Sequence, residues 1–397
     1  MFTRLIISAL VSFILVHGYA QLQIQTIPIN SAAIDDQLNL LVYQPDSYET
    51  SEKSYPVLYV LDGQWFFYNG VGIQETLRGE NVMPEMLVVG IDFKNRSFRD
   101  SLLQVNWSGV LKLVNEEVPR LIHDRYRSAN EQVLFGWEQN ASLACQSILI
   151  KDTPFQGAVI SNGGSVDGEV ITNYATNETD TKYLFVANSK NDIYTRASTE
   201  DLVNHLKQFQ PSGIKWKYQS FDEEVHESLP YVSLYQGLRF FYHNYSAYII
   251  SDTRDFFDEG GMPALKQYFK ERGERFGLDT EINNSTKNML IWLAWKQDDF
   301  RSFDYFMKEF EEVLSTSRYA SAYWQSRLGT YYYTNEAYQK AINHFDIGIT
   351  NYPDPEYLAQ MYQYRGHAHL QLGHQKEGRL DLKKADELRS LCKETEG

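Results

Sequence analysis

The stretch Phe135-Gly136-Trp137-Glu138-Gln139-Asn140-Ala141-Ser142 says most about the fold of this chain. Phe135 closes a mostly apolar run, 132–135, that is typical of a buried strand. The residues after the stretch are small and favour a helix. A strand that turns directly into a helix needs small neighbours, because the two backbones nearly touch at the corner. The sequence therefore predicts a sharp strand-to-helix corner with Glu138 at its top.

Similar apolar runs occur on both sides of this corner. They lie at 57–61, 87–91, 157–160 and 183–187, and helix-like stretches such as 110–125 lie between them. Strands that alternate with helices form parallel sheets. The alternation of Leu38, Leu40 and Val42 predicts antiparallel strands that lead into the sheet. We expect an α/β domain with a mostly parallel sheet over residues 21–250.

The composition is that of a globular protein large enough for two domains. The chain has 397 residues, of which 43% are hydrophobic and 22% charged. Its formal net charge is −15, which argues against nucleic-acid binding because a phosphate backbone would be repelled. Cys145 and Cys392 fall in different expected domains, and we expect two unpaired thiols rather than a disulfide.

The first 20 residues have the features of a secretory signal peptide. Arg4 precedes a mostly apolar run at 5–16, and Gly18 and Ala20 supply small residues at the cleavage-determining positions. The alternative is a membrane anchor, but the run is shorter than the roughly 20 residues that a spanning helix needs. We expect a protein that is exported to the periplasm or secreted, with Gln21 as its new N-terminus and no membrane span after cleavage.

The second expected domain, 251–397, has helical periodicity and repeats itself. Gly329, Ala341 and Phe345 are separated by the same intervals as Gly366, Gly378 and Leu382: 12 residues from 329 to 341 and from 366 to 378, and 16 from 329 to 345 and from 366 to 382. A weaker unit precedes them, with Ile291, Ala294, Phe303, Met307 and Phe310. This pattern predicts helical repeats of the tetratricopeptide type; the alternative is a generic helical bundle. Either would bind a protein partner or cap the first domain rather than catalyse a reaction.

Further pieces of the first domain carry a family resemblance. They are 55–63, 88–92, Arg96 with 99–100, 117–119 with 126–127, and 226–230 with 233–239. With the 135–142 corner, they resemble the secreted esterase family that includes esterase D-like and siderophore (enterochelin) esterase-like hydrolases. The resemblance implies an α/β-hydrolase fold, a carboxylic ester as substrate and no cofactor. It also implies a nucleophile, an acid and a histidine that follow in that chain order.

Carried over onto this sequence, the resemblance assigns three catalytic positions and an oxyanion hole. Glu138 stands at the nucleophile position, His226 at the catalytic histidine, and Asp192 at the acid. Gly63, Gln64 and Gln139 stand at the oxyanion-hole positions. Asp192 has an alternative reading as a helix cap, a role for which Thr195 and Ser198 also compete.

The resemblance breaks at the corner itself. The family has G-H-S-x-G-G there, whereas this chain has Gly136-Trp137-Glu138-Gln139-Asn140-Ala141. A carboxylate is a weak nucleophile toward esters, because the anhydride that it forms collapses back. Asn140 would also crowd the turn, and Ser142 lies one helical turn too far along to replace the serine.

Two hypotheses for Glu138 follow from this departure. In the first, Glu138 forms an ion pair with His226 and favours an imidazolium, which cannot act as a general base. The protein would then be a degenerate esterase that binds a small-molecule ester, an ester analogue or a protein partner. In the second, it is an active hydrolase with unusual chemistry at Glu138, as in related folds where an elbow Asp attacks alkyl carbons.

No metal site or cofactor is expected. The sequence has no cysteine cluster, and His367 and His369 point to different faces of a predicted helix. The loop 161–164 is rich in glycine but is not followed by the Lys-Ser/Thr pair of a phosphate-binding loop.

Overall fold

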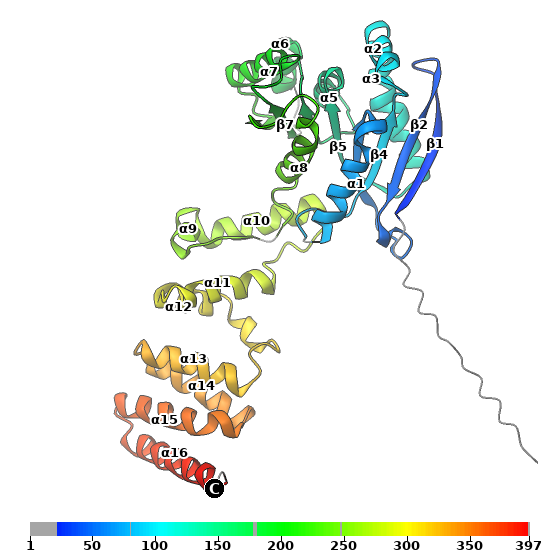
Figure 1. Ribbon diagram of the computed structural model, residues 1–397. Coiled ribbons are helices and arrows are strands. Elements are labelled where there is room, and N and C mark those ends of the chain that lie inside the picture. The colour runs from blue at the N-terminus through cyan, green and yellow to red at the C-terminus, as the bar shows by residue number, and fades with distance from the viewer. Residues whose placement is uncertain (1–21, 80, 178–180, 247, 396–397) are drawn as a thin grey trace, which may run out of the picture. The chain divides into compact units, whose positions relative to one another are not determined.

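The computed structural model describes residues 22–79, 81–177, 181–246 and 248–395, and the expected signal peptide and Gln21 lie outside them. The chain divides into two compact units, Met1–Ser246 and Ala247–Gly397, here called unit 1 and unit 2. Each is described by itself (Figure 1).

Unit 1 is built on one sheet of eight strands in the order β1-β2-β4-β3-β5-β6-β7-β8. The first two strands, β1 (Gln23–Ser31) and β2 (Asp36–Gln44), are antiparallel to each other, and β2 is antiparallel to β4. The remaining neighbours are all parallel. The parallel strands are β3 (Tyr55–Leu61), β4 (Leu87–Asp92), β5 (Ser128–Trp137), β6 (Gly157–Ser161), β7 (Lys182–Asn188) and β8 (Ile214–Ser220). The expected α/β architecture with a mostly parallel sheet is confirmed.

Helices cover both faces of this sheet, which is why the inner strands are continuous apolar runs. On one face, Leu58 and Val88 face Gly70 of α1 (Gly63–Gly79), and Val159 faces Gly237 of α8 (Leu229–Phe241). The alternate residues of the strands join a second core on the other face with α5 (Gln139–Leu149), α6 (Gly168–Asn177) and α7 (Arg196–Phe209). Because β3 to β8 are parallel, the corners that follow their carboxyl ends lie along the same edge of the sheet.

The helix expected at 110–125 consists of three consecutive segments. They are α3 (Trp107–Lys112), a π-helical turn (Leu113–Glu117) and α4 (Val118–Arg125), and α2 (Arg96–Val105) precedes them. Pro119 has no N–H to donate to the carbonyl of Asn115, and the wider turn lies directly before it.

Unit 2 is helical throughout the part of it that the structure describes. Its α-helices are α9 (Thr253–Asp258), α10 (Gly261–Phe276), α11 (Asn284–Lys296), α12 (Phe300–Glu309), α13 (Ala322–Thr334), α14 (Tyr338–Asn351), α15 (Pro355–Gln371) and α16 (Gln375–Thr395). Helices α11 with α12, α13 with α14, and α15 with α16 pack as pairs. A helical region after the α/β domain, as expected, is confirmed.

Small residues allow the helices of a pair to approach closely. A Cβ on Gly329 would lie 2.5 Å from the ring of Phe345, and one on Gly366 would lie 3.0 Å from the side chain of Leu382, the equivalent position of the next repeat. These are the positions that repeat in the sequence, so equivalent small residues make equivalent contacts.

The structure describes the side chain of one of the two cysteines. Cys145 is a buried free thiol in α5, and burial raises the pKa of its side chain to about 12. The side chain of Cys392 lies outside the described residues.

The close contact at the 135–142 corner can be tested with one methyl group. A Cβ on Gly136 would lie 2.1 Å from the carbonyl oxygen of Asn140, a backbone atom that cannot swing aside. We expect Gly136→Ala to lower the free energy of unfolding by at least about 2 kcal/mol, measured by urea denaturation. Gly72→Ala is the control: a Cβ at this exposed position in α1 meets nothing within 4 Å, so helix propensity should leave stability unchanged or slightly higher. Equal effects of the two substitutions would contradict this account of the corner.

Candidate functional site

Glu138 lies at the top of the corner between β5 and α5, in a strained conformation. Its φ is 53° and its ψ is −122°, a region that L-residues rarely adopt and that costs about 1–3 kcal/mol. Its N–H donates to the carbonyl of Ser161 at 3.1 Å, and its own carbonyl accepts from the N–H of Ala141 at 3.0 Å. These bonds to β6 and α5 hold the backbone in place, so the Glu138 side chain projects from the carboxyl edge of the sheet.

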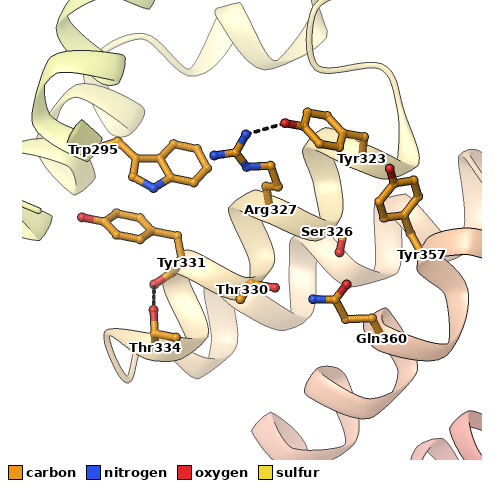
Figure 2. A pocket seen from close by; sticks show the side chains of 9 residues that line it. All are labelled: Trp295, Tyr323, Ser326, Arg327, Thr330, Tyr331, Thr334, Tyr357 and Gln360. Atoms are coloured by element: carbon orange, nitrogen blue, oxygen red, sulfur yellow. Dashed lines mark hydrogen bonds between the residues drawn. The ribbon is translucent and has the colours of Figure 1, made fainter.

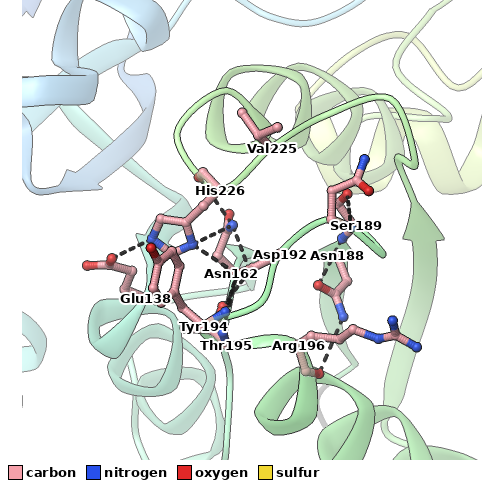
Figure 3. A network of polar contacts seen from close by, with 12 residues as sticks. Glu138, Asn162, Asn188, Ser189, Asp192, Tyr194, Thr195, Arg196, Val225 and His226 are labelled. Atoms are coloured by element: carbon pink, nitrogen blue, oxygen red, sulfur yellow. Dashed lines mark hydrogen bonds and ion pairs between the residues drawn. The ribbon is translucent and has the colours of Figure 1, made fainter.

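His226 lies between two carboxylates. Its Nε2 is 2.6 Å from Oε1 of Glu138, and its Nδ1 is 3.0 Å from Oδ1 of Asp192 (Figure 3). Glu138 follows β5, Asp192 follows β7 and His226 follows β8. The sheet thus brings together three side chains that are far apart in the sequence, in the region where ligands bind to open α/β sheets.

Asp192 holds the histidine and its own loop. Its Oδ2 accepts from the hydroxyl of Thr195 at 2.6 Å and from Nδ2 of Asn162 at 2.9 Å, and its Oδ1 accepts from the N–H of Tyr194 at 3.0 Å. Thr195, not Asp192, stands at the N-cap position of α7, and its side chain makes no capping bond there.

Two arginines also bind the carboxylate of Glu138. Nη1 of Arg96 lies 2.8 Å from Oε1 and 2.9 Å from Oε2, and Nη2 of Arg99 lies 2.5 Å from Oε2. The side chain of Arg96 is 51% exposed, whereas that of Arg99 is 1% exposed. Arg99 also donates to Asp62 at 3.0 Å, and Nδ2 of Asn140 donates to the same Asp62 oxygen at 2.9 Å. Asn140 therefore fits the corner by turning toward Asp62.

This arrangement favours the charged form of Glu138. Burial alone would raise the pKa of Glu138, but hydrogen bonds from Arg96, Arg99 and His226 outweigh it and hold the pKa below its usual value. In the same way, bonds from Thr195, Tyr194 and His226 overcome burial and lower the pKa of Asp192. The pKa of Asp62, by contrast, is raised to about 6 because burial dominates over its contacts with Arg99 and Asn140.

The chemical consequence concerns both candidate roles of Glu138. In a serine hydrolase, Nε2 of the histidine accepts the proton of the nucleophile. Here Nε2 contacts a carboxylate that carries no proton to transfer, and both carboxylate oxygens are already held by arginines. The geometry is that of a closed ion-pair network.

The three positions assigned to an oxyanion hole lie at two adjacent helix N-termini. Gly63 and Gln64 open α1 after β3, and Gln139 opens α5 after β5. β3 and β5 pair directly, with Val60 opposite Phe135, so the two helix starts are neighbours. The first N–H groups of a helix have no acceptor within it, so they are available to an anion. The side chain of Gln64 is used elsewhere: its Oε1 accepts from the N–H of Phe93 at 3.1 Å.

Aromatic side chains surround the Glu138–His226 pair. The rings of Trp137 and Tyr194 lie 5.2 and 5.1 Å from that of His226, and Trp65 packs edge-on against Trp137 at 5.8 Å. Tyr194 is 73% exposed and Trp65 is 37% exposed. The guanidinium of Arg96 lies 4.9 Å from the ring centre of Trp137.

Sequence reasoning missed four side chains of this network. Arg96, Arg99 and Asp62 lay in the matching segments but received no role, and Asn162 was considered only as part of a loop. The available signal was position: Asp62 and Asn162 directly follow strands β3 and β6, as Glu138 follows β5. Ser142 lies within α5, beyond the corner.

In the parts of the chain that the structure describes, no group of three or more His, Cys, Asp or Glu side chains could hold a metal ion. No described helix is long and apolar enough to cross a membrane.

Comparison with known proteins supports the esterase reading of unit 1. Residues 31–149, less than half of the chain, match the family model described as "Putative esterase". The uncharacterized protein YbbA of Bacillus subtilis (strain 168) is 34% identical over 55 residues, which are 14% of this chain. The match spans only 22% of the length of that relative.

Solved structures show the same fold at low identity. An uncharacterised protein from Capnocytophaga ochracea DSM 7271 is 15% identical, with a TM-score of 0.59 over 88% of this chain and 100% of that one. An IroE-like serine hydrolase from Shewanella oneidensis is 17% identical, with a TM-score of 0.53 over 72% of this chain and 98% of that one. Unit 1 therefore has an esterase-like α/β-hydrolase fold.

The charge of Glu138 should stabilise unit 1 in a pH-dependent way. We expect Glu138→Gln to lower the free energy of unfolding at pH 7 by about 1–3 kcal/mol, because Arg99 loses a charged acceptor in a buried place. Folding lowers the pKa of Glu138, so its contribution is present above the ordinary value of 4.5 and disappears as the pH falls through the lower folded value. Urea denaturation from pH 7 to pH 3 should show the gap between the two proteins closing.

Glu200→Gln is the matched control, because the Arg196–Glu200 pair is about half exposed. Exposed pairs contribute little, and we expect a change of about 0.5 kcal/mol or less. A gap for Glu138→Gln that stays constant over this pH range would show that ionisation of Glu138 does not stabilise the fold.

Proposed function

We propose that this protein is a catalytically degenerate member of the esterase-like hydrolases that acts by binding. One observation supports the proposal above all: the residue at the nucleophile position is a carboxylate bound at once by Arg96, Arg99 and His226. The negative charge that Glu138 brings in place of a hydroxyl is thus compensated by two positively charged side chains.

The energetics argue against ester hydrolysis at this site. A nucleophile must leave its contacts to attack, and Glu138 would have to break its bonds to two guanidinium groups, one of them buried. The anhydride that it would form with an acyl group is more reactive than the ester itself, and His226 contacts Glu138 instead of activating water. The ligand of this site is accordingly a small-molecule ester or an ester analogue that remains intact among Trp65, Tyr194 and Arg96.

A second candidate function is active hydrolysis with Glu138 in an unusual role. It is favoured by the intact His226–Asp192 pair and by the strained backbone at 138, both of which a catalytic elbow needs. In this case Glu138 would attack an alkyl carbon rather than a carbonyl and displace its leaving group, such as a halide. Water would then hydrolyse the resulting alkyl ester, which releases an alcohol and restores the carboxylate.

The proposed function also includes export of the protein and a binding role for unit 2. The apolar run at 5–16 and the small residues at 18 and 20 support export with cleavage before Gln21. The equal spacing of small residues in α13–α14 and α15–α16, together with their close helix contacts, supports tetratricopeptide-type repeats. Such repeats would bind a protein partner.

Ester turnover separates the two candidate functions. We expect wild type to hydrolyse p-nitrophenyl acetate no faster than Glu138→Ala, and a serine-directed fluorophosphonate to label neither. The double variant Glu138→Ser, Asn140→Gly should gain labelling and turnover, because the His226–Asp192 pair is already in place.

His226→Ala in that double variant is the control, and it should remove the gained activity. Wild-type turnover of esters or alkyl halides that Glu138→Ala abolishes would overturn the proposal and support the second candidate.

Export makes a separate prediction. When the full chain is expressed in a bacterium, we expect the mature protein to start at Gln21, as read from its intact mass. Leu10→Arg interrupts the apolar run at 5–16 and should leave the precursor uncleaved. Recovery of wild-type protein that retains residues 1–20 would argue for the membrane-anchor alternative.

A further inference from the structure

Unit 2 contains a pocket of about 260 Å³ that belongs to a different part of the molecule from the Glu138 site. One helix of each of three successive pairs lines it: Trp295 comes from α11, Tyr323 to Thr334 from α13, and Tyr357 and Gln360 from α15 (Figure 2). All the residues that line it belong to unit 2, so the inference rests on the partner binding proposed for unit 2 and not on the proposal for the Glu138 site.

Arg327 is the one charged residue that lines this pocket. Its guanidinium lies 5.1 Å from the ring centre of Trp295, 5.3 Å from that of Tyr323 and 5.5 Å from that of Trp324. Nη1 donates to the hydroxyl of Tyr323. These aromatic contacts fix the plane of the guanidinium and leave other N–H groups of the fork without a charged acceptor.

Arg327 has no counter-charge inside its pocket, although the chain has a net charge of −15. Among the described residues, no carboxylate lies within ion-pair distance of it. Arg365 in the same unit, by contrast, binds Asp346 at 2.6 Å and Asp381 at 2.7 Å. Arg327 is therefore a cation prepared for an acceptor that the described part of the chain does not supply.

A second observation points to a polar ligand. The hydroxyl of Thr330, one turn after Ser326 on the same wall of the pocket, is buried and has no hydrogen-bond partner among the described residues. A buried hydroxyl without a partner destabilises the protein, and a ligand that accepts a hydrogen bond from it would remove that cost. Figure 2 shows Gln360 on the facing helix, across the pocket from Thr330. The pocket thus offers a cation and a hydroxyl on one helix and an amide opposite them.

The remaining walls are aromatic. Trp295 stacks on Tyr331 at 5.0 Å, and Tyr323 packs edge-on against Tyr357 at 6.0 Å. A single arginine matches the charge of a carboxylate, which accepts two parallel N–H bonds from a guanidinium. We infer that this pocket binds a carboxylate carried beside an aromatic or large apolar group. Such a group can come from the C-terminal residue of a peptide or from an acidic side chain within one.

Three synthetic peptides test the inference by isothermal titration calorimetry on the full mature chain. They are Ac-Ala-Ala-Ala-Phe with a free carboxylate, the same peptide as its C-terminal amide, and the amidated Ac-Ala-Asp-Phe-Ala. We expect at least one carboxylate-bearing peptide to bind at least about tenfold more tightly than the neutral amide, since a charge-assisted pair is lost in the latter. Tight binding of the first peptide identifies a chain terminus as the source, and tight binding of the third identifies an acidic side chain.

Variants tie the binding to the pocket. Arg327→Gln should weaken binding at least about tenfold. Arg379→Gln, which removes the same charge from an exposed position on α16, should leave the affinity unchanged. Thr330→Val should weaken binding severalfold without lowering the melting temperature, because it replaces a hydroxyl that the free protein leaves unpaired. No binding of either acidic peptide at millimolar concentration, or equal binding of the amide, would overturn the inference. Affinity that both Arg327→Gln and Thr330→Val leave unchanged would also overturn it.

Discussion

The buried guanidinium of Arg99 is the constraint on which the site depends. A charge that is 1% exposed must be compensated by partners, and Arg99 finds them in Asp62, Asp100 and Glu138. Asp62 directly follows β3 and Glu138 directly follows β5, so this one cation joins the carboxyl ends of two neighbouring strands. The carboxylate at the elbow therefore has a structural partner, and its presence there is part of a charge balance between α2 and the ends of β3 and β5.

In the degenerate site that we propose, the same balance explains why an esterase-like order of side chains lacks the chemistry of an esterase. The backbone at residue 138 keeps the strained geometry of an elbow, and His226 keeps its contact with Asp192. What differs is the group that faces Nε2. A hydroxyl would give its proton to the imidazole and become a nucleophile, whereas a carboxylate held by Arg96 and Arg99 has neither a proton to give nor freedom to move.

The two units differ in whether the charged and polar groups of their sites have partners. In unit 1, the charges of the Glu138 site are satisfied by one another, and an incoming ligand meets aromatic rings and the exposed Arg96. In unit 2, among the described residues, Arg327 has no charged acceptor and the hydroxyl of Thr330 has no hydrogen-bond partner. A site that is internally paired resists a charged ligand, because binding must first break existing bonds. A site that is left unpaired gains from one.

Local patterns in the sequence determined the elements and their order. Apolar runs of strand length, the small residues of the 135–142 stretch and the repeated spacing in unit 2 act between neighbours along the chain, so they can be read without knowing the fold. They also placed Glu138 at a strand-to-helix corner. His226 and Asp192 came from family resemblance, which supplies chain order but not contacts.

Only the tertiary structure decided which charges meet. Arg96 and Glu138 are 42 residues apart, Arg99 and Glu138 are 39 apart, and Glu138 and His226 are 88 apart. Whether such side chains touch depends on the order of the strands in the sheet and on the loops that follow them, and no periodicity records that order. The pairing of Asn162 with Asp192 and the contact of Arg327 with a hydroxyl rather than a carboxylate were hidden for the same reason: each is a property of what surrounds a residue in space.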